Sequence, residues 1–79
     1  MNWRDHITSS PEVLGGEPVV RGTRLAVEFL LGLSAAGWSE AQILANYPSV
    51  SADALRGVYG YAAEAISEDT LYQVNRLAG

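Results

Sequence analysis

Hydrophobic and polar residues change their spacing along this chain near residue 27. Before this point, short apolar pieces at residues 13–14, 19–20 and 25–27 alternate with Gly, Pro and Ser, as is typical of short strands and turns. From Val27 onward, apolar residues recur at helical spacing. The pattern therefore predicts a short N-terminal β segment followed by a mainly α-helical domain.

Local signals place the boundaries of the first two helices. The first is expected over residues 26–36, where Gly37 provides a stop. The second begins with a capping box formed by Ser39 and Gln42. Pro48 ends it, because the residue before a proline avoids the helical region.

A third helix is expected to begin after Ser51, which caps it. Its inward stripe is expected to contain Leu55, Val58, Tyr59, Ala62 and Ile66. Three helices in this order match the outline of a trihelical helix-turn-helix domain.

The outward face of the third helix carries two interior glycines, Gly57 and Gly60. Each costs up to about 1 kcal/mol relative to alanine. Their presence suggests that a DNA backbone, a symmetry mate or the folded-back C-terminal tail approaches this face closely. The alternative is that both are tolerated surface glycines beside an ion pair between Asp53 and Arg56.

The C-terminal segment carries a second apolar stripe, at Leu71, Val74 and Ala78. In a continuous helix, this stripe would be rotated by roughly 130° from that of the third helix. We therefore divide the chain into a domain over residues 1–66 and a partner-binding tail over residues 67–79.

Composition narrows the classes of function. A chain of 79 residues with 48% hydrophobic content is one small domain near the size where folding alone is marginal, so we expect self-association. It contains no cysteine and no long apolar stretch, so we expect a cytoplasmic location without membrane contact. The net charge of -4 argues against a generic polyanion binder.

The chain has five cations, all of them arginine. If Gly22 and Thr23 form a two-residue turn, Arg21 and Arg24 become cross-strand neighbours, and like charges in that position destabilise a hairpin. We therefore expect an anion at this tip.

Catalysis and metal binding are poorly supported. His6 is the single histidine, and no carboxylate or serine near it has a spacing that indicates a mechanism. One histidine and scattered carboxylates make no recognisable metal-ligand set, so we expect no enzyme, no metal and no cofactor.

Several motifs together resemble the family known as domain of unknown function 433. The match runs in order over roughly residues 3–66, and its core is the G-x-P-x-x-x-G-T-R run at residues 16–24. It also includes Ile7, Pro11-Glu12-Val13, Val27, Gly37-Trp38-Ser39, Ile43-Leu44, Tyr47-Pro48 and Leu55.

The resemblance implies a VapB-like antitoxin, paired with a PIN-like ribonuclease toxin, in which a homeodomain-like helix-turn-helix follows the β segment. It also implies a homodimer that represses its own operon and a C-terminal region that neutralises the toxin. The expected DNA contacts are Arg21, Thr23, Arg24, Ser49, Ser51 and Arg56. The expected toxin contacts are Glu64, Glu68, Leu71, Tyr72, Val74 and Leu77. The alternative is a dimeric protein-interaction module without DNA binding, in which Arg21 and Arg24 pair with carboxylates.

Overall fold

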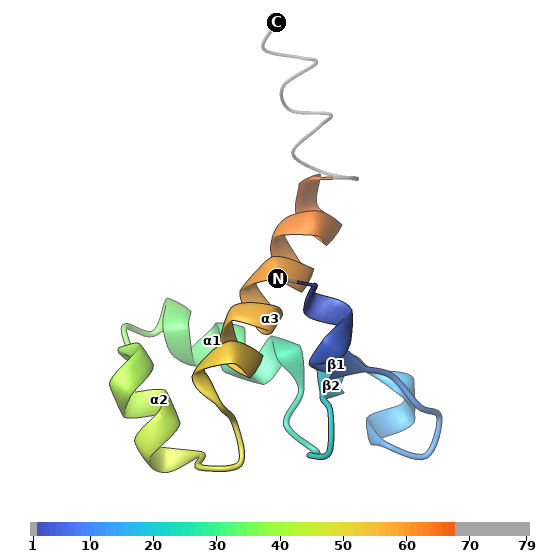
Figure 1. Ribbon diagram of the computed structural model, residues 1–79, viewed down its shortest axis with the longest axis horizontal. Coiled ribbons are helices and arrows are strands. Elements are labelled where there is room, and N and C mark those ends of the chain that lie inside the picture. The colour runs from blue at the N-terminus through green and yellow to red at the C-terminus, as the bar shows by residue number, and fades with distance from the viewer. Residues whose placement is uncertain (1, 68–79) are drawn as a thin grey trace, which may run out of the picture.

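The computed structural model describes residues 2–67 and is mainly helical, with a short two-stranded sheet near the N-terminus (Figure 1). Three α-helices follow the sheet: α1 (Val27–Ala35), α2 (Glu40–Asn46) and α3 (Ala52–Ile66). Before them come a 3-10 turn η1 (Trp3–Asp5), strand β1 (Ile7–Thr8), a 3-10 turn η2 (Leu14–Gly16) and strand β2 (Val19–Val20). This order confirms the predicted β segment and the three helices after it.

The sheet is minimal, and it brings the N-terminus to α3. Strands β1 and β2 pair antiparallel, with Ile7 opposite Val20 and Thr8 opposite Val19. In Figure 1, η1 therefore lies beside α3, while α1 and α2 lie toward the other side of that helix. The C-terminal turns of α3 project beyond the rest of the domain.

Capping side chains define the helix starts as predicted. Ser39 and Gln42 form a complete capping box, in which the Gln42 amide donates to Ser39 Oγ at 3.1 Å and the Ser39 amide donates to Gln42 Oε1 at 2.8 Å. Ser51 Oγ accepts from the Ala54 amide at 3.0 Å and caps α3. After α1, Gly37 adopts a φ of 96°, a left-handed conformation that ends a helix.

The core forms where the three helices meet the sheet. Its fully buried side chains are Leu30, Ile43, Leu55, Val58 and Val19. The predicted inward stripe of α3 is wrong at two positions, because Tyr59 is 40% exposed and Ile66 is 49% exposed. The Tyr59 hydroxyl lies 2.7 Å from Ser34 Oγ at the edge of α1, whereas Ile66 lies on the projecting end of α3, beyond the core.

Candidate functional site

The arginine-flanked tip is a hairpin loop, but its geometry differs from the predicted two-residue turn. The Thr23 amide donates to the Val20 carbonyl at 3.0 Å, so Arg21 and Gly22 are the central residues of the turn. Gly22 has a φ of 81°, which the third position of a type II turn requires. The Val20 amide donates to the Leu25 carbonyl at 3.0 Å, and this bond closes the loop. The prediction that Gly22 and Thr23 alone form the turn is therefore wrong.

Thr23 holds this loop together through its hydroxyl. Thr23 Oγ1 donates to the Val20 carbonyl at 2.8 Å and accepts from the Leu25 amide at 3.0 Å. The side chain is partly buried, and both functions of the hydroxyl are used within the hairpin. Thr23 therefore stabilises the loop through hydrogen bonds within the hairpin.

The two arginines at the tip have different environments. The Arg21 guanidinium donates to the Arg4 carbonyl at 3.1 Å and to the Asp5 carbonyl at 3.3 Å, so it satisfies orphan carbonyls of η1. Arg24 is exposed and makes no hydrogen bond or ion pair with any residue in 2–67. The expected cross-strand repulsion is avoided because Arg21 extends toward the N-terminal segment.

The N-terminal segment also explains the glycines of α3. A Cβ atom built on Gly57 would lie 3.0 Å from His6 Cβ, and one built on Gly60 would lie 3.6 Å from Trp3 Cβ. The close approach predicted for this face is therefore made by η1 and the residue after it. Gly57 is buried as a result. The prediction that it lies on an outward face is therefore wrong.

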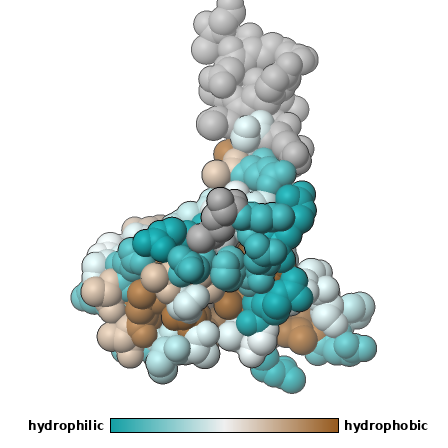
Figure 2. Space-filling view, viewed as in Figure 1, coloured by the Kyte–Doolittle hydropathy of each residue, from teal (hydrophilic) through white to brown (hydrophobic). Residues whose placement is uncertain are grey.

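Contacts among Trp3, Arg4, Tyr61 and Glu64 hold η1 against α3. The Trp3 indole donates to Glu64, and an Arg4 guanidinium nitrogen lies 3.7 Å from the Glu64 carboxylate. The Trp3 ring packs edge-on against Tyr61 with centroids 4.9 Å apart, and the Arg4 guanidinium lies 4.4 Å from the Trp3 ring centroid. Glu64, an expected toxin contact, is thus already engaged within the domain. Figure 2 shows hydrophilic residues gathered over this junction of η1 and α3.

Three of the expected DNA contacts lie at or just before the start of α3. Ser49 is exposed, Ser51 is the N-cap, and Arg56 pairs with Asp53 at 2.9 Å. The Arg56–Asp53 ion pair expected under the alternative for this face is therefore present. Both of its side chains are mostly exposed, at 59% and 66%, so the pair contributes little to stability.

The remaining expected toxin contacts, Glu68, Leu71, Tyr72, Val74 and Leu77, lie outside the described residues. Within residues 2–67, no three His, Asp or Glu side chains gather closely enough to hold a metal ion. Over the same part of the chain, every helix is too short or too polar to cross a membrane.

Comparisons with known proteins agree on one family. The chain is 46% identical over 59 residues to the uncharacterized protein y4eO of Sinorhizobium fredii (strain NBRC 101917 / NGR234), covering 75% of this chain and 27% of that relative, so it spans about a quarter of the relative's length. The crystal structure of a DUF433 member protein from Anabaena variabilis ATCC 29413 matches with a TM-score of 0.71 and 30% identity, covering 92% of this chain and 67% of that one.

The family model described as "Protein of unknown function (DUF433)" matches residues 7–62, from β1 to the last third of α3. This range contains the Gly22-Thr23-Arg24 tip, the capped starts of α2 and α3, and the glycine face that receives η1. On this match and on the relatives above, the chain belongs to the DUF433 family.

Proposed function

We propose that this protein is a VapB-like antitoxin that neutralises a PIN-like ribonuclease toxin by direct contact. In this proposal, residues 67–79 bind the toxin, and the domain over residues 1–66 forms a homodimer that binds operator DNA. The proposal is supported by the resemblance of the motifs at residues 16–24 and 37–48 to antitoxins of this family.

The end of α3 is the observation that carries the proposal. Ile66 is 49% exposed and Ala65 is exposed where α3 projects from the domain. Apolar residues continue beyond it, since Leu71 and Val74 follow with a different helical phase. An exposed apolar helix end that is followed in the sequence by further apolar residues favours a partner that covers it. We assign that partner as the toxin.

Neutralisation would work by covering the nuclease or by placing carboxylates in its basic RNA-binding cleft. Because Glu64 is engaged with Trp3 and Arg4, the acidic contribution is assigned to Glu68 and Asp69. The test is co-purification of the product of the adjacent reading frame with the full chain and with a variant lacking residues 67–79. The truncated chain should remain folded and lose binding, and unchanged binding would overturn the assignment of the tail.

DNA binding is supported by the exposed polar groups at two places. Arg24 projects from the hairpin tip, while Ser49 and Arg56 lie at the start of α3. Arg21, Thr23 and Ser51 would act by positioning these segments, since their polar groups are engaged internally. In a dimer the patch would be doubled, which adds local cations for phosphate contacts although each chain carries a net charge of -4. A gel-shift assay with the DNA upstream of the gene, at low salt and with and without the neighbouring gene product, tests this part.

The second candidate is a protein-interaction module that does not bind DNA. It is favoured by the Arg21 contacts, because a guanidinium that binds the carbonyls of Arg4 and Asp5 has fewer donors left for phosphate. The acidic net charge favours it as well. Absence of any shift in the gel assay, together with intact binding to the neighbouring gene product, would select this candidate.

A further inference from the structure

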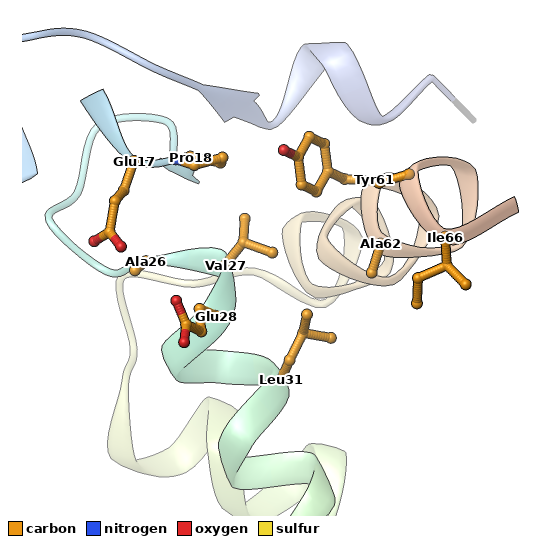
Figure 3. Close-up of a pocket in the computed structure, with 10 residues that line it drawn as sticks. Glu17, Pro18, Ala26, Val27, Glu28, Leu31, Tyr61, Ala62 and Ile66 are labelled. Atoms are coloured by element: carbon orange, nitrogen blue, oxygen red, sulfur yellow. The ribbon is translucent and has the colours of Figure 1, made fainter. Parts of the chain in front are cut away.

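An apolar groove of about 260 Å³ lies between the start of α1 and the C-terminal half of α3 (Figure 3). Val27 and Leu31 form the wall contributed by α1. Ala62, Ala65 and Ile66 form the wall contributed by α3, and Pro18 and Tyr61 close one end. The small alanine side chains on α3 leave the groove open. This surface does not include the hairpin tip, and it meets the η1 junction only at Tyr61, which also packs against Trp3.

Two carboxylates border this groove. Glu17 precedes β2, and Glu28 lies in the first turn of α1, where the helix dipole favours a negative charge. In Figure 3 both carboxylates lie on the same side of the groove. Both residues are exposed, and neither carboxylate makes a hydrogen bond or an ion pair with any described residue of the chain. The apolar groove therefore has an acidic border without a counter-charge from residues 2–67.

The apolar surface continues past these carboxylates. A second, more open hollow shares Glu17 and Glu28 with the groove and adds Phe29 and Leu33 to the lining. Phe29 is 43% exposed and packs edge-on against Tyr47. The two carboxylates thus lie between two apolar hollows. A ligand that fills both hollows needs a cation between its apolar groups.

Charge complementarity disfavours two occupants from this chain. A second copy that packs the same face about a two-fold axis would bring Glu17 and Glu28 of both copies together, and like charges oppose such a contact. The chain's own tail carries one cation, Arg76. At 100° per residue, a helix would place Arg76 roughly 160° from Val74 and from Ala78, on the side opposite the apolar stripe.

We propose that this groove, together with the adjoining hollow, binds a segment of a partner protein that presents an apolar stripe with a lysine or arginine beside it. We assign the segment to the toxin, and to that extent the inference rests on the proposed function. The apolar side chains fill the space beside Leu31 and Ile66, while the cation pairs with Glu17 and Glu28. The toxin is then held at two places, by this groove and by residues 67–79.

The first experiment reverses the charge of the border in the full chain. The double variant Glu17→Lys/Glu28→Lys is compared with Glu12→Lys/Glu40→Lys, which changes the net charge equally at exposed sites outside both hollows. Affinity for the purified product of the adjacent reading frame is measured by calorimetry. We expect the groove variant to bind about tenfold more weakly or worse, and the control to stay within about twofold of wild type.

A second experiment tests the groove without the toxin. Two synthetic 14-residue amphipathic helices with the same leucine stripe are titrated into the full chain, one with lysines beside the stripe and one with glutamates. The lysine peptide should shift the methyl NMR signals of Val27, Leu31 and Ile66, and the glutamate peptide should not. In the Glu17→Lys/Glu28→Lys variant, this preference should reverse.

The outcomes separate the two proposals. If the neighbouring gene product binds wild type and the groove variant equally, the groove inference is overturned. The proposed function is then retained, with residues 67–79 as the toxin-binding segment. If that product does not bind wild type at all, the proposed function fails, and the peptide experiment decides the groove. Equal shifts with both peptides, or shifts that cluster away from the groove, would overturn the inference in either case.

Discussion

His6 packs against Gly57 so closely that a Cβ atom at residue 57 would lie 3.0 Å from His6 Cβ. This contact places the N-terminal segment on α3 and closes the face that would otherwise be available to a partner. The Gly57 contact is with the first side-chain carbon of His6, which cannot move without its backbone. The absence of a side chain at Gly57 therefore makes room for the backbone and Cβ atom of His6.

We expect Gly57→Ala to destabilise the domain by up to about 2 kcal/mol, because the overpacking it introduces costs roughly 1 to 3 kcal/mol, against a gain of about 1 kcal/mol in helix propensity. The matched control is Gly32→Ala in α1, where a Cβ atom would meet nothing within 4 Å. That variant should gain about 1 kcal/mol. Thermal and urea unfolding of both variants measure the difference, and a stabilised Gly57→Ala would show that η1 does not hold this position.

We expect substitution of Arg21 to lower the stability of the domain and substitution of Arg24 to leave it unchanged. Arg21→Ala removes the donors to the Arg4 and Asp5 carbonyls and should lower stability by about 1 kcal/mol, a modest value because the site is exposed. Arg24→Ala should leave the unfolding midpoint unchanged, because Arg24 has no hydrogen bond or ion pair with residues 2–67. Urea unfolding of both variants checks this, and equal losses would contradict the assignment.

For DNA binding, we expect Arg24 to matter more than Arg21. If Arg24 contacts a phosphate, Arg24→Ala weakens binding to operator DNA and reduces the slope of the log affinity against log salt by about 1. Arg24→Lys retains the charge and is the control. An unchanged slope in Arg24→Ala would exclude this arginine from the DNA contact, and the slope is measured by fluorescence anisotropy over a range of salt concentrations.

Thr23 offers a test of the hairpin loop. Thr23→Val keeps the shape of the side chain and removes the hydroxyl that bonds to both Val20 and Leu25, so we expect a loss of about 1 to 2 kcal/mol. Thr23→Ser retains the hydroxyl and should recover most of this stability. Chemical denaturation compares the two variants, and a Thr23→Val protein as stable as wild type would contradict the role given to the hydroxyl.

Ser51 and Ser49 form another matched pair. Ser51→Ala removes the N-cap of α3 and should cost about 1 kcal/mol, whereas Ser49→Ala should be nearly neutral because Ser49 caps nothing. If Ser49 contacts DNA, its variant should instead lose operator affinity at unchanged stability. Unfolding curves and gel shifts on the same preparations distinguish the two roles.

The sequence by itself determined the elements whose signals are local. The capping box of Ser39 and Gln42, the Ser51 cap and the stop at Gly37 act over three or four residues, so the helix boundaries could be predicted from neighbouring positions. The glycines of α3 also indicated a close approach. Their neighbour could not be identified, because His6 is separated from Gly57 by fifty residues of chain.

Only the tertiary structure decided where Arg21 binds and where the apolar groove forms. Arg21 reaches η1 because the pairing of β1 with β2 brings residues 4–5 beside the hairpin, and this removes the expected repulsion with Arg24. The groove beside Glu17 and Glu28 arises where the start of α1 meets the far end of α3. Both depend on contacts between segments distant in sequence, which the spacing of residues along the chain does not encode.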